Sequence, residues 1–361
     1  MSVKKRIVLT ICFLLLMLTA SSCSKGKNKA IDNQKNFDVP KYPNIMIMEN
    51  KSDKINFYKA DQDSMTKMGS MDNVREIVYN NNNSIVGLLM PDKDNLKKNT
   101  IRVISGKGEN IIDGFYFAKD LRLSPNGENL AYRSFKDQSL DSAQGLSLYS
   151  VENNKKIDFE SQVLTSGNLY AWISDEEILY YGASVKDGKN TGIFKYNTKE
   201  HKEEMYVGNI KGYCTYFMPL GDKILILSRD IEENKLYIYN KGKDESINIS
   251  NNIENVYDGI FDRNNNLVYI IASEKNVDIP TLYKINLTSY KIERINYDFP
   301  KIVDPDGGLR VDSNGLLYYC GFTSLEENTD NNNDVFMYNP KENSNNLISI
   351  DSSQYKINGS N

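Results

Sequence analysis

A short strand pattern recurs along the chain at an almost constant spacing. Apolar and aromatic side chains alternate in each copy, and several copies end in Asn. The copies are INFYK (55–59), IRVIS (101–105), LSLYS (146–150), IFKYN (193–197), LYIYN (236–240), LYKIN (282–286) and VFMYN (335–339). Their fourth residues lie 46, 45, 47, 43, 46 and 53 positions apart. Such a period is typical of a repeat protein in which each repeat is one supersecondary unit.

A polar turn between two strands precedes each copy from the second onward. The turns are rich in Asn, Asp and Gly and lie at 80–83, 124–127, 174–176, 221–222, 264–266 and 313–315. These residue types tolerate a positive φ, so the turns predict β-hairpins. The strand after each turn is a nearly continuous apolar run, which is typical of a strand buried on both faces. A further strand follows several copies, for example residues 155–159 and 291–297.

The repeat unit is therefore four short antiparallel strands, and helical periodicity is absent after the first 23 residues. This pattern predicts an all-β fold, a β-propeller with seven four-stranded blades. A ring of six or eight blades is the alternative. We expect Tyr196 and Tyr239, at equivalent positions of the pattern, to be buried between blades on the third strand of each. Closed packing of blades leaves only short, protected sheet edges.

The two ends of the chain indicate how the ring closes. The first copy, residues 55–59, has only one strand before it, residues 44–48, so its innermost strand is missing. The chain continues past the last complete blade with QYKIN, residues 354–358. We expect this tail to supply the missing strand, which would make the first blade a composite of both ends of the chain.

One blade carries a motif that resembles a known family. Residues 123–132, LSPNGENLAY, resemble the S-P-D-G-x-x-[LI]-A-[FY] motif of TolB-like, WD40-like bacterial propellers. Residues 313–318 match the same motif less well. The resemblance covers residues 44–358 in architecture but only one blade in motif. It implies a propeller fold. That group includes scaffolding proteins, binding proteins and accessory domains of enzymes, so the function it implies is broad.

The first 23 residues have the pattern of a bacterial secretory signal peptide. A basic segment at residues 4–6 is followed by an apolar stretch at residues 7–18, which is shorter than the ~20 residues of a spanning helix. The ending, Ala20-Ser-Ser-Cys23, resembles the lipobox at which lipoprotein signal peptides are cut, although Ala20 and Ser22 depart from its commonest form. An ordinary secretion signal is the alternative, with Cys23 as an incidental thiol.

If Ala20–Cys23 is a lipobox, the chain is divided into three parts. Residues 1–22 are the signal peptide, residues 23–40 are a flexible tether, and residues 41–361 are the propeller domain. Cys23 would carry acyl chains such as palmitate, which hold a protein at a membrane surface. We therefore expect a protein anchored to the extracytoplasmic face of the cell membrane.

Composition excludes several classes of protein. Of the 361 residues, 40% are hydrophobic, which is enough for a large core and argues against a disordered chain. The 44 basic and 48 acidic residues give a net charge of −4, so we expect no nucleic-acid partner. The single histidine, His201, lies in a charged turn and is expected to be solvated. We expect Cys214 and Cys320, in apolar strand-like runs, to be buried free thiols, with one disulfide between them as the alternative.

Ligands of propellers usually meet the mouth of the central channel, which the innermost strands line. The candidate ligand-binding residues there are Arg75, Arg122, Tyr170, Trp172, Tyr213, Tyr216, Asp258, Asp306 and Arg310. Arginines in comparable strand positions could bind a carboxylate, a phosphate or an acidic glycan, and aromatic rings could stack on sugar or peptide. The alternative is that the arginines pair with neighbouring acids while the aromatic rings pack between blades.

The sequence predicts no catalytic residue, no cofactor and no metal site. The Asp-rich segments 304–308 and 330–334 lack the spacing of an EF-hand loop, so we expect both to be solvated loops. The chain contains no G-x-S-x-G elbow and no nucleotide-binding glycine loop followed by a helix.

The function we expect is binding or scaffolding of an envelope protein, peptide or glycan through one propeller face. The rival is an enzyme at the channel mouth, such as a lyase, glycosidase or cyclase. Such enzymes usually need paired carboxylates or a metal at the site, for which Asp258 and Asp306 are the main candidates. A sensory or spore-envelope accessory lipoprotein is a third possibility.

Overall fold

The computed structural model describes residues 39–52, 54–186, 190–297, 299–324 and 332–359. The expected signal peptide, Cys23 and the tether as far as residue 38 lie outside these residues. In the part of the chain that is described, no helix has the length and apolarity needed to cross a membrane.

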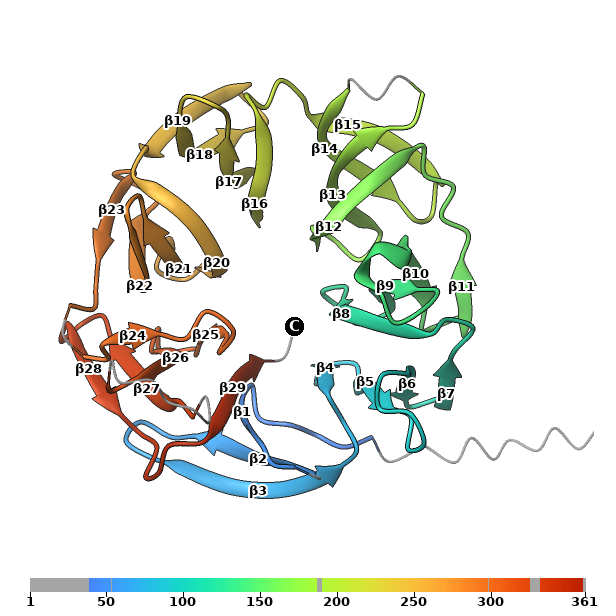
Figure 1. Cartoon of the computed structure of the whole chain (residues 1–361), viewed down its shortest axis with the longest axis horizontal. Helices are drawn as coiled ribbons and strands as arrows, with labels where there is room; N and C mark the ends of the chain where they lie inside the picture. The colour runs from blue at the N-terminus through green and yellow to red at the C-terminus, as the bar shows by residue number, and fades with distance from the viewer. Residues whose placement is uncertain (1–38, 53, 187–189, 298, 325–331, 360–361) are drawn as a thin grey trace, which may run out of the picture. The chain divides into compact units, whose positions relative to one another are not determined.

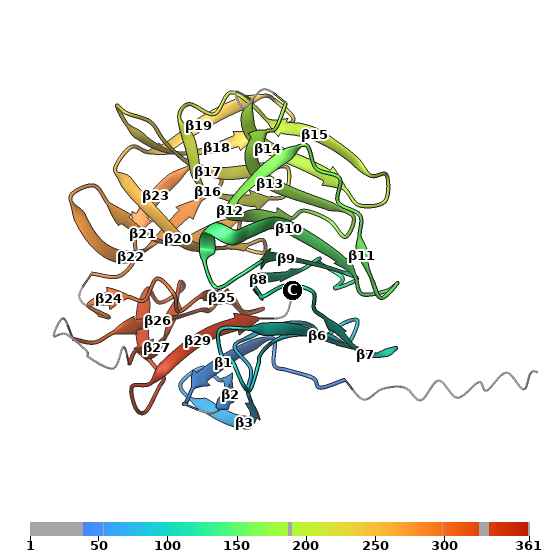
Figure 2. The same ribbon diagram turned by 45° about the vertical axis from the view of Figure 1, so that its right-hand side comes forward.

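The strands of the described residues form seven antiparallel sheets around one axis, as the blades of a propeller (Figures 1 and 2). Blade 1, from the axis outward, consists of β29 (Gln354–Gly359), β1 (Ile45–Asn50), β2 (Lys54–Ala60) and β3 (Met65–Asp72). Blade 2 consists of β4 (Glu76–Asn80), β5 (Ile85–Pro91), β6 (Asn99–Ser105) and β7 (Gly108–Ile112). Blade 3 consists of β8 (Phe117–Leu123), β9 (Asn129–Phe135), β10 (Ala143–Ser150) and β11 (Lys155–Ile157). The all-β, seven-bladed fold expected from the repeat is confirmed.

The remaining blades follow in chain order. Blade 4 consists of β12 (Val163–Trp172), β13 (Glu177–Ser184), β14 (Thr191–Asn197) and β15 (Lys202–Val207). Blade 5 consists of β16 (Tyr213–Leu220), β17 (Lys223–Arg229), β18 (Asn234–Asn240) and β19 (Glu245–Ser250). Blade 6 consists of β20 (Ile253–Asp262), β21 (Leu267–Glu274), β22 (Val277–Asn286) and β23 (Lys291–Arg294). Blade 7 consists of β24 (Ile302–Val303), β25 (Leu309–Val311), β26 (Leu317–Phe322), β27 (Asp334–Asn339) and β28 (Ser344–Leu347). In blade 7 the inner position is shared by β24 and β25, which both pair with β26.

The hydrophobic core lies between the blades. The second strand of each blade is buried on both faces, as in β21, where Val268 to Ala272 are fully buried. One apolar cluster fills the space between each pair of neighbouring blades. Between blades 1 and 2, for example, Met46 and Phe57 pack with Ile77 and Tyr79. Both faces of a blade are therefore covered only when both neighbours are present.

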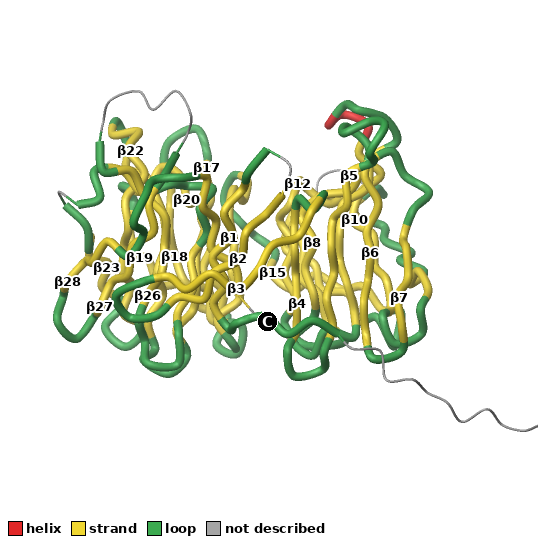
Figure 3. The backbone as a smooth tube through the Cα atoms, turned by 90° about the horizontal axis from the view of Figure 1, so that it is seen from below, coloured by secondary structure: helices red, strands yellow, loops and turns green. Residues whose placement is uncertain are grey.

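The two faces of the propeller differ in their connections (Figure 3). The turn face carries the short polar hairpins, at 81–84, 124–128, 173–176, 221–222, 263–266 and 312–316. The opposite face, which we call the long-loop face, carries the connections between the second and third strands and between blades, among them 92–98, 136–142, 230–233 and 295–301. It also carries the 3₁₀ turn η1 (Leu140–Ser142), the helical element among the described residues (red in Figure 3).

The chain ends meet in blade 1. β29 pairs antiparallel with β1, so that Ile45 lies opposite Gly359 and Asn50 lies opposite Gln354. Tyr355 and Ile357 are buried while Lys356 between them is exposed. The Ile357 N–H also donates to the Gly307 carbonyl of blade 7 at 2.7 Å. The expected composite blade is confirmed, and its inner strand extends one residue beyond the expected range.

The tyrosines of the repeat are buried to different degrees. Tyr196 on β14 is 1% exposed, as expected. Tyr239 on β18 is only half-buried, because its ring packs at the margin of the cluster between blades 4 and 5 while its hydroxyl reaches Asp244 at 2.6 Å in an exposed turn. The prediction of burial is therefore confirmed for Tyr196 and only partly met by Tyr239.

The two cysteines of the propeller are free and buried, on β16 and β26, as expected. Burial raises the pKa of the Cys214 thiol to about 12 and raises that of Cys320 well above its usual value. Both thiols are therefore protonated at neutral pH and belong to the core.

If β29 closes the ring, substitutions of neighbouring residues in the tail should differ strongly in their effect on the free energy of unfolding. Ile357→Ala should lower the free energy of unfolding by about 2–5 kcal/mol, because it removes a buried side chain between blades 7 and 1. Lys356→Ala is the matched control and should change it by less than about 0.5 kcal/mol. Deletion of residues 352–361 should lower the melting temperature of the full chain more than either substitution. Equal melting temperatures for the deletion and the wild type would show that the ring closes another way.

Candidate functional site

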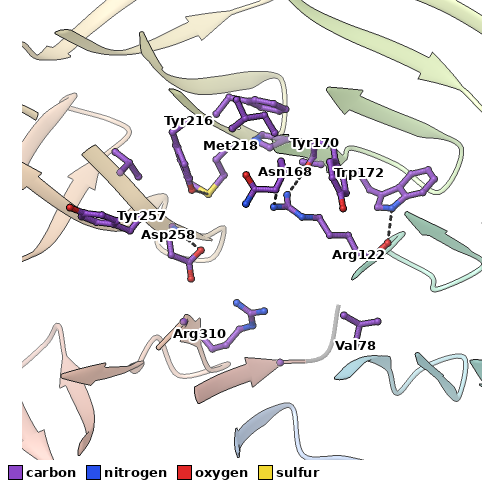
Figure 4. Close-up of a pocket in the computed structure, with 18 of the residues that line it drawn as sticks. Val78, Arg122, Asn168, Tyr170, Trp172, Tyr216, Met218, Tyr257, Asp258 and Arg310 are labelled. Carbon is purple, nitrogen blue, oxygen red and sulfur yellow. Dashed lines mark hydrogen bonds between the residues drawn. The ribbon is translucent and has the colours of Figure 1, made fainter. Parts of the chain in front are cut away.

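A cavity of about 690 Å³ lies on the propeller axis, and we call it the channel cavity. The innermost strand of every blade contributes to its lining. One residue from each is Val78, Arg122, Tyr170, Tyr216, Asp258, Arg310 and Asn358 (most are labelled in Figure 4). The site is thus assembled by closure of the ring, because no single blade contains it.

Six of the residues predicted from the sequence line this cavity together: Arg122, Tyr170, Trp172, Tyr216, Asp258 and Arg310. Three others lie outside it. Arg75 precedes β4 and is exposed, with its guanidinium donating to the Leu96 carbonyl at 2.6 Å. Tyr213 is the first residue of β16 and is 51% exposed. Asp306 is exposed in the loop between β24 and β25.

Arg122 is held by the neighbouring blade. Its guanidinium donates to the Tyr170 carbonyl and, at 3.3 Å, to the Asn168 carbonyl. It lies 4.9 Å from the centre of the Tyr170 ring, within the range of a cation–π contact. These hydrogen bonds engage only part of a guanidinium that has five N–H groups. Arg122 therefore has a fixed position in the cavity and N–H groups left for a ligand.

A β-bulge in β8 sets the position of Arg122. The pairing of β8 with β9 shifts between Lys119 and Arg122, and Asp120 has a φ of 60°. The Asp120 carboxylate forms an ion pair with Arg133, and the Asp120 carbonyl accepts the Tyr170 hydroxyl. The Trp172 indole N–H donates to the Arg122 carbonyl at 3.0 Å. Contacts from blade 4 thus hold the bulged strand at Asp120, within the bulge, and at Arg122, directly after it.

Arg310 and Asp258 lie on the opposite side of the cavity (Figure 4). The Arg310 guanidinium donates to its neighbour, the Leu309 carbonyl, at 2.6 Å and approaches the Asn358 side-chain oxygen at 3.5 Å. The Asp258 carboxylate accepts the N–H of Gly259 at 2.8 Å and of Leu309 at 3.1 Å. Burial raises the pKa of Asp258, while the positive charge of Arg310 opposes the shift. Within the described chain, neither Arg122 nor Arg310 forms an ion pair, so the first half of the predicted alternative, arginines paired with neighbouring acids, does not hold here. The second half holds for Tyr170, which is 1% exposed and packs between blades 3 and 4, and in part for Trp172 and Tyr216, which pack against apolar clusters between blades.

Aromatic and amide side chains complete the lining. Sequence reasoning missed Asn168, Met218, Tyr257 and Asn358, which all line the cavity. Asn168 could have been found, because it lies two residues before Tyr170 and four before Trp172 on one strand, and alternate residues share a face. Asn358 could have been found from the predicted role of the tail as an inner strand.

The acidic segments do not assemble a metal site in the described residues, where no group of three or more His, Cys, Asp or Glu side chains converges. Asp304 instead accepts hydrogen bonds from the Asp306 N–H and the Asn333 side chain. Of the segment 330–334, residues 330 and 331 lie outside the described residues. The expectation of a solvated loop is wrong for Asn333 and Asp334, which are buried because Asp334 begins β27 and accepts hydrogen bonds from the Ser349 and Ser352 hydroxyls. His201 is exposed in the turn between β14 and β15, as expected.

The chain matches no model of a protein family and no curated protein. Several solved structures share its fold. It is similar to an uncharacterized protein from Listeria monocytogenes EGD-e, with 12% identity, a TM-score of 0.55, and coverage of 84% of this chain and 90% of that chain. It is also similar to oligogalacturonate lyase from Vibrio parahaemolyticus, with 11% identity, a TM-score of 0.52, and coverage of 84% of each chain.

The likeness to TolB itself is weaker. TolB from Acinetobacter baumannii has 10% identity, a TM-score of 0.46, and coverage of 87% of this chain and 82% of that chain, which is too distant to support an argument. At such identities the likenesses show a common propeller fold and say nothing of a ligand or an activity.

Glu76 on β4 adds a titratable contact to the bulge that positions Arg122. Its carboxylate accepts the Leu121 N–H at 2.8 Å. Burial, and then the nearby Asp120 carboxylate, raise the pKa of Glu76 to about 7, against the lowering effect of that hydrogen bond and of Arg122. The bulged strand that positions Arg122 is therefore held by a carboxyl group that changes charge near neutral pH, although Glu76 itself does not line the cavity.

This raised pKa predicts a pH dependence of stability. The unfolded chain releases the Glu76 proton near the ordinary glutamate pKa, so the folded state binds more protons between that value and pH 7. Stability must then fall as the pH rises through this window. Between pH 4.5 and pH 8, the free energy of unfolding of the wild type should fall by about 3 kcal/mol more than that of Glu76→Gln.

Urea unfolding at several pH values measures this difference. Gln keeps an oxygen that can accept the Leu121 N–H but does not titrate. Glu245→Gln, at an exposed glutamate on β19, is the control and should keep the pH profile of the wild type. Parallel profiles for Glu76→Gln and the wild type would contradict the prediction.

Proposed function

We propose that this chain is a lipid-anchored, extracytoplasmic binding protein whose channel cavity holds a carboxylate-bearing part of an envelope protein, peptide or glycan. The observation that carries the proposal is the pair of arginines in the cavity. Arg122 and Arg310 come from different blades, extend into the same space and form no ion pair among the described residues (Figure 4). Arginine has the donor geometry that matches a carboxylate.

The charge of the lining supports an anionic ligand. Its charged residues are Arg122, Arg263, Arg310 and Asp258. The Asp258 carboxylate already accepts two backbone N–H groups, and burial raises its pKa. The field in the cavity is therefore positive, and its partly enclosed walls strengthen the attraction of an anion.

The aromatic side chains support a ligand with flat or apolar parts beside the carboxylate. Trp172, Tyr216 and Tyr257 line the same cavity as the arginines and are at least partly exposed, whereas Tyr170 is buried between blades 3 and 4 under the Arg122 guanidinium. Tyr and Trp rings offer faces on which a sugar or a peptide side chain can pack. A few fixed polar groups among aromatic walls are typical of a small-ligand site.

The anchor rests on the sequence of the first 23 residues. If Cys23 carries the lipid, the chain joins the propeller at the turn face, because the described chain begins there. The Tyr42 N–H donates to the Asn81 side chain at 3.3 Å, and Asn81 lies in a hairpin of that face.

We do not propose an enzyme for this site. Glycosidases of the usual type need two carboxyl groups that face each other across the substrate. Among the described lining residues of the channel cavity, Asp258 is the carboxylate present, and Asp306 lies outside. The fold shared with oligogalacturonate lyase does not change this, because fold alone carries no activity.

Ligand binding is tested with simple carboxylate probes. In isothermal titration calorimetry, the full chain in nanodiscs should bind a glucuronic-acid disaccharide or the dipeptide N-acetyl-Glu-Glu more tightly than their neutral counterparts. Arg122→Gln and Arg310→Gln should each weaken binding about tenfold, because each removes a charge-assisted hydrogen-bond donor. Arg294→Gln, on β23 and outside the cavity, is the matched control. Loss of binding in Arg294→Gln alone would place the ligand elsewhere and overturn the proposal.

The anchor is tested by fractionation of cells that produce the protein. The wild type should be recovered in the membrane fraction, cleaved and lipid-modified, because acyl chains partition into the bilayer. Cys23→Ala should leave the membrane fraction or remain uncleaved. Cys214→Ala, at a buried thiol, is the control and should fractionate as the wild type. A Cys23→Ala protein that stays cleaved and membrane-bound would contradict lipid attachment at this residue.

A further inference from the structure

Exposed apolar side chains gather on the long-loop face. Large apolar residues that are mostly solvent-exposed occur in its loops in successive blades, namely Leu96, Leu140, Val185 and Ile231, and at Tyr297 and Ile350 between blades. In the described part of the chain, no such residue lies in the hairpins of the turn face. Exposed apolar groups concentrated on one face mark a surface that contacts another molecule.

A groove of about 690 Å³ opens on this face between blades 2 and 3, and we call it the blade 2–3 groove. It is lined by Arg75, Glu76, Leu89, Lys97, Asn99, Phe117, Ala118, Lys119, Gln138 and Leu140. None of these residues lines the channel cavity, so the groove is a separate site.

The floor of the groove is apolar and fixed. Leu89 and Ala118 are buried, and the Phe117 ring stacks on Phe135 with the ring centres 4.2 Å apart. The Asn99 side chain joins the two blades, accepting the Ala118 N–H at 2.7 Å and donating to the Ala118 carbonyl at 3.0 Å. Leu140 stands beside this floor and is 61% exposed. An apolar side chain of a partner would find a preformed surface here.

The rim of the groove is cationic. Arg75, Lys97 and Lys119 are exposed, and within the described residues none of them forms an ion pair. Arg75 donates to the Leu96 carbonyl and Lys97 donates to the Gln138 side chain at 3.3 Å, so both have further donors free. The one acidic residue of the described lining is Glu76, whose pKa is raised to about 7. The rim therefore attracts negative charge close to the apolar floor.

From this charge complementarity we propose that the blade 2–3 groove docks a peptide segment of a partner protein that carries carboxylates beside apolar side chains. The apolar side chains pack on Phe117 and Leu140, while the carboxylates meet Lys97, Lys119 and Arg75. The site is independent of the channel cavity and of the ligand proposed for it. The neighbouring exposed residues of the long-loop face extend the contact to a protein surface.

A synthetic peptide of alternating Glu and Leu, labelled with fluorescein, tests the proposal. In fluorescence anisotropy, the full chain in phosphatidylcholine nanodiscs should bind this peptide, with empty nanodiscs as the blank. A Lys-Leu peptide should bind at least tenfold more weakly, because its charge is reversed, and a Glu-Ser peptide should bind more weakly because it lacks apolar groups. Raising the salt concentration should weaken the Glu-Leu complex. Equal binding of the Glu-Leu and Lys-Leu peptides would overturn the proposal.

Matched variants locate the binding site. The double substitution Lys97→Glu and Lys119→Glu should weaken binding of the Glu-Leu peptide about tenfold. The double substitution Lys67→Glu and Lys243→Glu makes the same change of charge at exposed lysines outside the groove and should have no effect. Leu140→Ser should weaken binding without changing its salt dependence, which provides a second readout if the charge-reversed chain fails to fold.

Three other outcomes would overturn the proposal. Loss of peptide binding in Arg122→Gln or Arg310→Gln, with the groove variants unaffected, would place the peptide in the channel cavity. Concentration-dependent dimers in sedimentation velocity that the groove variants abolish would identify a second copy of this chain as the occupant. Flotation with phosphatidylserine vesicles, lost in the groove variants and without binding of the Glu-Leu peptide, would identify a lipid surface. Because the channel ligand is tested with different probes and variants, the two proposals can fail separately.

Discussion

Every blade of this protein depends on apolar packing against both of its neighbours. The second strand of each sheet has no polar face, so a blade exposed on one side would present a row of Val, Ile, Leu and Tyr side chains to water. An apolar cluster fills each interface of the described propeller, including the one that joins blade 7 to blade 1 through Ile47, Tyr318 and Ile357. The composite blade follows from this requirement, because only a closed ring covers all of these surfaces.

Closure also determines the chemistry at the axis. The polar groups of the channel are held by bonds that cross from one blade to the next. Arg122 of blade 3 donates to carbonyls of blade 4, and the Leu121 N–H beside it donates to Glu76 of blade 2. The Leu309 N–H of blade 7 donates to Asp258 of blade 6. A small shift of one blade would therefore move a side chain that another blade presents, and the rigid apolar interfaces prevent such shifts.

The sequence alone was enough to predict the architecture, because the strand period is visible when the seven copies are compared and the missing inner strand is visible before the first copy. It predicted the site less completely. Arg75 and Arg122 seemed equivalent by strand phase, but β4 begins after Arg75, and the bulge at Asp120 changes the direction of the residues that follow. The half-burial of Tyr239 depends on the turn at Asp244. Such features arise from tertiary contacts, which a local pattern does not encode.

The pairing of β29 with β1 also constrains the order in which the protein can fold. Ile47 lies opposite Ile357, so the first strand of the propeller cannot complete its sheet until nearly the whole chain has been synthesised. The other blades are formed from consecutive strands and can assemble earlier, from contacts that are local in sequence. Until the last residues arrive, the inner edge of β1 carries unpaired backbone groups that could pair with another chain. Protection of that edge during synthesis is thus as much a requirement of this fold as any contact in the finished ring.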